Sequence, residues 1–314
     1  RSVRAEFAPL LPETVASLTA AFSARPSACL LSLADALVEA FGARASSDVE
    51  ASFASLIDQL AARAFAAIAP DPSNEPALLS SLLSHADTYA KLLVPAIAAA
   101  SALPSLLNLA ATVLGTCREA EPCDAAMSFL CSVGAAARTL APSAPNAGST
   151  HTAEGAHAIR TRLQLALASS TGRAILRGCI IGLADTLPEP SLPCVAECLA
   201  PLLHLESWRA NDDGLAAWAL DVLTELPATE GAPDARCRQT LHQILTTFPD
   251  ACSTGARYHK VVGILSKALV DFGKIARRKQ SANGFVLDAY DWSDAAMQKQ
   301  QAGHSQISPG FGRA

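Results

Sequence analysis

Residues 29–70 read CLLSLADALVEAFGARASSDVEASFASLIDQLAARAFAAIAP and contain two runs in which apolar residues recur every three or four positions. Gly42 follows the first run, and glycine commonly ends a helix at this place. Ser47 opens the second run with Glu50 three residues later, which is a capping-box pattern, and Pro70 ends it. The stretch therefore predicts a pair of amphipathic helices joined by a short polar turn.

The same pattern recurs in about ten to twelve runs of some 15 residues over residues 7–279, and none of them alternates as a strand does. Such helix pairs bury their apolar faces only by stacking, and the period of roughly 40–47 residues is typical of HEAT and armadillo repeats. We therefore predict an all-α fold, an α-α superhelix (HEAT/armadillo-like solenoid) of about six helix pairs over residues 1–279. Residues 141–156 lack periodicity, so we expect a flexible loop there, and a disordered tail over residues 280–314.

Composition argues against a membrane-spanning or secreted protein. The longest unbroken apolar run, residues 92–100, is too short to cross a bilayer and contains Pro95. The chain starts at Arg1 without a signal-peptide pattern, which we interpret as a piece of a longer protein. The nine cysteines are an odd number, and the sequence predicts buried thiols in a reducing compartment. The cysteines expected in apolar helical surroundings are Cys29, Cys131, Cys179 and Cys198.

Charge is distributed unevenly along the chain. Residues 1–254 carry 15 basic and 25 acidic side chains, a balance of −10, whereas residues 255–314 carry 9 and 4, a balance of +5. Binding to a nucleic-acid backbone needs clustered Lys and Arg, so an acidic body disfavours it. A basic protein partner fits this balance better.

Two stretches resemble a known family. Residues 29–42, CLLSLADALVEAFG, resemble a helix near the end of the transportin-SR and importin-thirteen branch of the importin-β superfamily, and residues 190–199, PSLPCVAECL, resemble that branch's later LPxVAExL helix start. Their separation and the position of the last amphipathic helix agree with the branch, and the resemblance extends from residue 1 to about residue 279. It implies the C-terminal part of a nuclear transport receptor that shuttles between cytoplasm and nucleus, carries protein cargo past nucleoporins and is governed by the GTPase Ran.

The resemblance also implies where cargo and Ran would bind. In the branch, an Arg-rich inner helix holds Arg/Ser-rich tails, and here only Arg4, and less securely Arg1, would belong to its last turn. The N-terminal repeats that bind Ran in the family are absent from this chain. From the acidic balance, the short apolar runs and the motifs that are missing, we expect no cofactor, no direct contact with nucleic acid and no membrane.

Carboxylates in two predicted helices are candidates for a partner surface. Asp35 and Glu39 lie four residues apart in one helix, and the other helix carries Asp212, Asp213, Asp221 and Glu225. A pair of catalytic carboxylates needs a concave pocket, and nothing around these residues predicts one. We interpret them as a solvated face or, if the second helix of each pair lines the concave side, as a surface for a basic ligand.

The last predicted helix has basic residues opposite an apolar side. Its apolar side comprises Val262, Leu265, Leu269, Phe272 and Ala276. Its basic side comprises Lys260, Lys267, Lys274 and Arg278. This pattern is typical of a terminal cap with a polar outer face. The alternative is a docking stripe for an acidic or phosphorylated partner, and the three basic residues 277–279 are weak evidence for a localisation signal.

Motifs for catalysis and for metal or phosphate binding are missing. The cysteines lack paired CxxC or HxxxH spacing, and no GxxxxGK[ST], GxGxxG, GxSxG or HExxH pattern occurs. We therefore predict a binding protein rather than an enzyme: the cargo-binding part of a Ran-dependent import receptor. The alternatives are a HEAT scaffold of a multiprotein complex, such as a phosphatase, and an exporter of the same superfamily.

Overall fold

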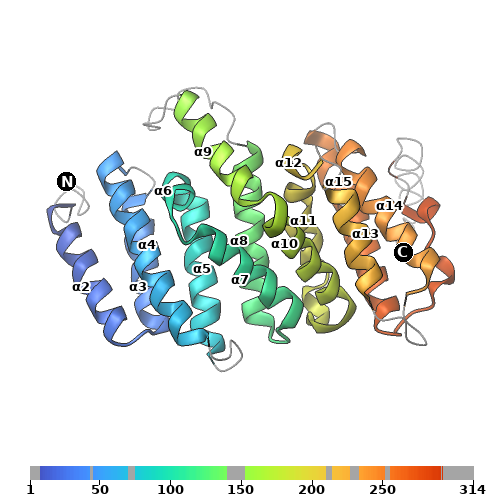
Figure 1. The fold of residues 1–314 in the computed structure, drawn as a ribbon, viewed down its shortest axis with the longest axis horizontal. Helices are drawn as coiled ribbons and strands as arrows, with labels where there is room; N and C mark the ends of the chain where they lie inside the picture. Colours follow the sequence, from blue (N-terminus) through green and yellow to red (C-terminus); the bar gives the residue numbers. More distant parts are fainter. Residues whose placement is uncertain are drawn as a thin grey trace, which may run out of the picture.

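The computed structural model describes residues 8–42, 45–69, 75–139, 153–209, 214–226, 233–251, 255–290 and 292, and every element in these residues is helical. The prediction of an all-α fold is confirmed for them. The helices lie side by side along the long axis of an elongated molecule, from α2 at one end to α13, α14 and α15 at the other (Figure 1).

The helices of the first half follow one another closely. They are η1 (Ala8–Leu10), α2 (Leu11–Ala24), α3 (Ala28–Phe41), α4 (Ser47–Ile68), α5 (Pro76–Leu92), α6 (Val94–Ala99), α7 (Leu103–Thr116) and α8 (Ala120–Thr139). The predicted periodicity of the quoted stretch is confirmed, since Phe53, Leu56 and Leu60 of α4 are fully buried. By length and composition alone α4 could cross a membrane, but it packs against α2, α5 and α6 as a core helix does.

The second half is interrupted more often. It contains α9 (Ala153–Ala166), α10 (Ser169–Ile181), η4 (Gly182–Thr186), η5 (Glu189–Ser191), α11 (Cys194–Leu203), α12 (Glu206–Arg209), α13 (Leu215–Glu225), α14 (Ala235–Ala251), α15 (Gly255–Ala276), η6 (Ala282–Gly284) and η7 (Leu287–Tyr290). The expected loop over 141–156 is wrong at its end, because α9 already begins at Ala153; residues 141–152 lie outside the described residues.

Contacts between helices define two layers. In the α8 layer, α3, α5, α8 and α11 pack in succession; in the α10 layer, α2 packs on α4, α4 on α6, α7 on α10 and α10 on α13. The buried side chains between the layers form one continuous apolar cluster from Leu11 to Tyr290. α4, for example, buries one side, as the 3.6-residue period requires, whereas eight of the ten residues of α11 are buried.

Neighbouring helices within a layer run in the same direction. In the α8 layer, Asp35 of α3 contacts His85 of α5, and Gly42 at the end of α3 lies beside Leu93, just after α5. In the α10 layer, two ion pairs in register join α10 to α13. At these two contacts, neighbouring helices of one layer are therefore parallel.

The last helix departs from this pattern. His204, which follows α11, lies 6.1 Å from Tyr258 near the start of α15, measured between ring centroids. Farther along α15, the Ser266 hydroxyl donates to the carbonyl of Pro193, the residue before α11. α15 therefore runs antiparallel to α11, the helix on which it packs.

The predicted disorder from residue 280 is wrong for residues 281–290. Phe285 and Tyr290 are 2% and 3% exposed, and the Tyr290 hydroxyl donates to Asp271 Oδ2 at 2.8 Å. The Phe285 ring lies 6.1 Å from that of Phe272, so the segment covers the end of the apolar cluster. Only isolated apolar residues occur in this segment, which is why no periodicity marked it.

Candidate partner-binding face

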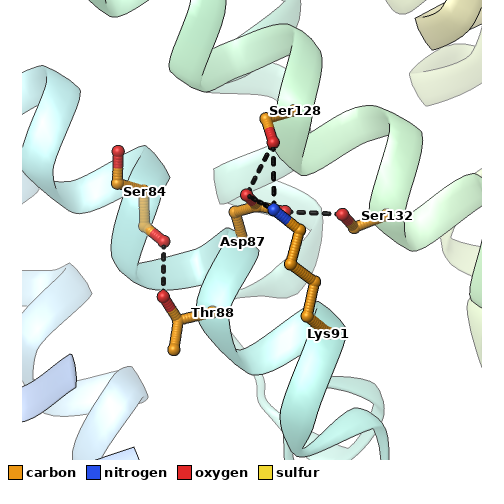
Figure 2. Close-up of polar contacts among 6 residues, drawn as sticks. All are labelled: Ser84, Asp87, Thr88, Lys91, Ser128 and Ser132. Atoms are coloured by element: carbon orange, nitrogen blue, oxygen red, sulfur yellow. Dashed lines mark hydrogen bonds and ion pairs between the residues drawn. The ribbon is translucent and has the colours of Figure 1, made fainter. Parts of the chain in front are cut away.

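A buried carboxylate joins α5 to α8 (Figure 2). Asp87 Oδ2 accepts hydrogen bonds from Lys91 Nζ and Ser128 Oγ, each at 2.7 Å, and Oδ1 accepts one from Ser132 Oγ at 2.6 Å. Asp87 is 7% exposed, whereas the Lys91 side chain is 54% exposed. A buried carboxylate is tolerated when its oxygens are paired in this way.

The amine and the hydroxyls of this cluster are all directed to one carboxylate. Lys91 Nζ lies 3.3 Å from Ser128 Oγ, and both donate to Asp87 Oδ2. Ser132 donates to the other carboxylate oxygen. The cluster therefore ties α8 to α5.

Asp35, a predicted partner-binding residue, contacts a buried side chain of the neighbouring helix α5. Its Oδ1 lies 2.6 Å from Nδ1 of His85, which is fully buried and whose Nε2 has no partner. Tyr89 packs edge-on against the His85 ring and donates its hydroxyl to the Phe53 carbonyl. Burial, followed by the carboxylate of Asp35, raises the pKa of Tyr89. Glu39, one turn beyond Asp35 on α3, is exposed.

Polar side chains continue across α8 to α11. Asp124 of α8 accepts a hydrogen bond from Ser191 at 2.8 Å, just before α11. Burial raises the pKa of the half-buried Cys131 thiol, and the nearby carboxylates of Glu197 on α11 and Asp87 on α5 raise it further. Glu197 is exposed. We call the polar side of the α8 layer, with Glu39, Asp87, Lys91, Ser128, Ser132, Asp124 and Glu197, the α8 face.

The other predicted acidic residues lie elsewhere. Asp221 and Glu225 belong to α13 in the α10 layer, at the far end of the molecule from α3 (Figure 1). Asp221 pairs with Arg173 at 3.0 Å and Glu225 with Arg177 at 2.7 Å, and all four side chains are 41–54% exposed. Asp212, Asp213 and Arg4 lie outside the described residues. Of the predicted carboxylates that the structure describes, Asp35 and Glu39 therefore lie in one layer, and Asp221 and Glu225 in the other.

The basic side of α15 is partly in contact with Tyr290, which follows later in the same chain. Lys260 and Lys267 are exposed, Lys274 is half-buried, and Arg278 is exposed with a left-handed φ of 59°. Lys267 Nζ lies 5.6 Å from the centre of the Tyr290 ring. The predicted apolar side is confirmed for Leu265, Leu269 and Phe272, which are fully buried.

Two basic residues after α15 have partners that the sequence did not indicate. Arg277 donates from Nε to the carbonyl of Leu183 and from Nη2 to that of Gly182, and so satisfies carbonyls of η4. Lys279 Nζ lies 2.5 Å from Glu189, and this ion pair lowers the pKa of Glu189. The sequence shows that both residues are basic and near a helix end. It does not show their partners, because these lie about 90 residues away in the chain.

The eight cysteines among the described residues are free thiols in mixed surroundings. Cys179 and Cys198 are buried as predicted, Cys131 is half-buried, and the prediction for Cys29 is wrong, because it lies exposed in the first turn of α3. Burial raises the pKa of the Cys123 and Cys237 thiols to about 12. Among the described residues, no three His, Cys, Asp or Glu side chains are placed to hold a metal ion.

Comparisons of the sequence with protein-family models and with curated proteins find no match. The charges of the α8 face are paired or solvent-exposed, and its hydroxyls hold α5 to α8. Such a face can offer many weak polar contacts to a partner along several helices.

Proposed function

We propose that this chain is a protein-binding array of HEAT-like helix pairs, and that it forms the C-terminal cargo-binding part of a Ran-dependent nuclear import receptor. The observation that carries the proposal is the α8 face, on which four successive helices present polar side chains beside one another. The finer assignment to import receptors is supported by the resemblance of residues 29–42 and 190–199 to that family.

Binding on such an array would be distributed over many contacts. Each helix pair contacts mainly its neighbours, so small rotations between pairs add up along the molecule. Asp87 of α5 accepts hydrogen bonds from Ser128 and Ser132 of α8, and so links two such pairs. A partner on the α8 face would select one curvature of the array, and this would couple cargo to Ran bound farther upstream.

The partner that this face favours is basic. Glu39, Asp124 and Glu197 are exposed carboxylates of the α8 face, and the charge of Lys91 is compensated by Asp87. The balance of −10 over residues 1–254 has the same sign. Complementary charge raises the association rate and selects among partners.

The assignment to import is tested with the longer protein that we expect to carry this chain. Cargo bound to the full-length receptor is challenged with Ran loaded with GTP or with GDP. An importer releases its cargo when Ran-GTP, but not Ran-GDP, is added. An exporter binds more cargo when Ran-GTP is added. A protein that ignores both forms of Ran while holding its partner is a scaffold, and this result would refute the proposal.

The binding face is tested with the chain itself and a fluorescent Arg/Ser-rich peptide. Reversing Glu39 and Glu197 to Lys should weaken binding about tenfold or more, since two attractive charges become repulsive. The matched control reverses Asp221 and Glu225, which lie in the α10 layer, and should bind as the wild type does. Equal loss in both variants would mean that only net charge matters and that the α8 face is not the site.

A further inference from the structure

A cavity of about 530 Å³ opens in the α10 layer, away from the α8 face. Side chains from α9, α10, α12 and α13 meet there. Its polar lining includes Ser169, Ser170, Arg173 and Ser207. Leu165 and Trp218 provide apolar surface. The volume is in the range of small-ligand sites, and it exceeds what one inorganic ion needs.

The N-terminus of α10 is open at this cavity. The residue before the helix is Ala168, and no side chain caps the first turn. The first N–H groups of a helix have no intrahelical partner and carry a partial positive charge. Ser169 and Ser170, in that turn, are exposed and line the cavity. This end of the cavity is therefore rich in hydrogen-bond donors.

Ser207 is a half-buried residue of the cavity lining. Its hydroxyl oxygen is buried and has no hydrogen-bond partner. A buried hydroxyl without a partner is unfavourable and calls for an explanation. The neighbouring Trp208 is fixed by a hydrogen bond of 2.8 Å from Nε1 to the Leu167 carbonyl, so this wall is held in place. A bound acceptor would satisfy the Ser207 hydroxyl.

The charge of the lining favours an anion. Among the described residues that line the cavity, Arg173 is the charged one. Its partner Asp221, 3.0 Å away, does not line the cavity, and the same holds for Arg177 and Glu225 one turn farther along. Arg173 has five N–H donors and can hold a second carboxylate beside the first.

An apolar wall lies next to these donors. Leu165 is 70% exposed, an unusual exposure for a leucine in this fold, and the buried Trp218 closes the other side. A ligand that suits both parts has a carboxylate with an apolar group on the adjacent carbon. The C-terminal residue of a polypeptide has this chemistry, and carboxylate capture by backbone N–H groups is a known recognition mode.

We propose that this cavity binds the C-terminal carboxylate of a partner polypeptide that ends in an apolar residue. The site lies in the other layer from the α8 face and does not depend on the chain being a transport receptor. The carboxylate would lie between Arg173, the Ser207 hydroxyl and the start of α10. The last side chain would pack against Leu165 and Trp218.

The test measures the anisotropy of a short fluorescent peptide ending in leucine, with the full chain. The free acid should bind, and the same peptide with an amidated end should bind at least tenfold more weakly, because it lacks the charge. Arg173→Met should weaken the acid about tenfold. Arg177→Met is the matched control, because it breaks an equivalent ion pair outside the cavity and should leave binding unchanged.

A second variant separates binding from folding. Ser207→Ala removes a hydroxyl that has no partner in the free protein, so stability should stay the same or rise while peptide affinity falls severalfold. Equal affinities for acid and amide, or equal losses in the two arginine variants, would overturn the proposal. Octanoate should displace the peptide; if octanoate binds while the peptide acid does not, the cavity takes small amphiphiles and the proposal fails.

Discussion

Two neighbouring interfaces, one in each layer, hold the middle of the molecule by different means. Where α7 meets α10, backbones touch: Gly115 faces Gly178, and a Cβ on Gly178 would overlap the backbone of Ala111. Where α5 meets α8, a carboxylate lies between the helices and accepts three side-chain hydrogen bonds (Figure 2). The first interface depends on the absence of a side chain, and the second on the presence of one.

The difference determines which interface tolerates change. A helix contact made through glycine has no flexible group that can move aside, since both surfaces are backbone. Gly182 repeats this feature one turn after Gly178, close to the Leu114 carbonyl, which also accepts a hydrogen bond from Thr186. The Asp87 cluster contains serine rotors and the half-exposed Lys91, which can adjust. Substitutions should therefore be more damaging at α7–α10 than at α5–α8.

The largest effect is expected for Gly178→Ala. The new methyl group would collide with the Ala111 carbonyl, and α10 must move away from α7. We expect a loss of about 3 kcal/mol or more in the free energy of unfolding, measured by urea denaturation followed by circular dichroism. Gly263→Ala is the control: nothing lies within 4 Å of that position in α15, so alanine should stabilise by about 0.5–1 kcal/mol. Similar values for the two variants would show that α7 and α10 are not in close contact.

A smaller effect is expected for Asp87→Ala. Ser128 and Ser132 would lose their acceptor in a half-buried place, whereas Lys91 would become hydrated again. The expected destabilisation is about 2 kcal/mol. Ser132→Ala removes one of the three hydrogen bonds and should destabilise by about 1 kcal/mol, by the same denaturation measurement. If Asp87→Ala were as harmful as Gly178→Ala, the proposed contrast between the interfaces would be wrong.

The apolar periodicity predicted the helices well because burial follows it directly. Phe53, Leu56 and Leu60 lie on one side of α4 by their spacing, and they are buried for the same reason. Glycine did not reveal the α7–α10 contact, since a glycine inside a helical run indicates lower propensity as readily as close packing. Only the relative position of two helices about 65 residues apart distinguishes these cases.

The candidate site was predictable only in its residue types. Charge patterns indicated acidic surfaces, but whether a carboxylate faces solvent or a neighbour depends on which helices lie adjacent. Asp35 pairs with His85, and Asp221 pairs with Arg173; in each pair the partner is about 50 residues away in the chain. Asp87, the carboxylate with most partners, was not singled out, because one Asp in an apolar helix has no pattern of its own. The cavity in the α10 layer was not predictable from the sequence either, because its lining comes from four separate helices.

The free energy of unfolding should depend on pH through the Cys131 thiol of α8, which lies near Asp87 of α5. The pKa of Cys131 is raised above its ordinary 9.0 by burial and by the Glu197 and Asp87 carboxylates. The unfolded thiol ionises first as the pH rises, so the stability that the protonated thiol provides is present below about pH 9 and lost above it. As the pH rises from about 8 through the raised pKa of the folded thiol, wild type should lose more free energy of unfolding than Cys131→Ala. Parallel losses in both proteins would mean that the thiol is hydrated in the folded state.

The smallest effect concerns the Arg173–Asp221 ion pair of α10 and α13. Both side chains are about half-exposed, so solvent screens their attraction. In the Lys91–Asp87 pair, by contrast, the carboxylate is buried. A double-mutant cycle with Arg173→Met and Asp221→Asn should give a coupling of about 0.5 kcal/mol or less, and 0.5 M salt should remove it. The equivalent cycle on Lys91 and Asp87 should give a larger coupling that salt reduces less. A large, salt-resistant coupling at α10–α13 would instead place that pair among the interactions that hold the layers in register, and its arginine would be less free to bind a ligand in the cavity beside it.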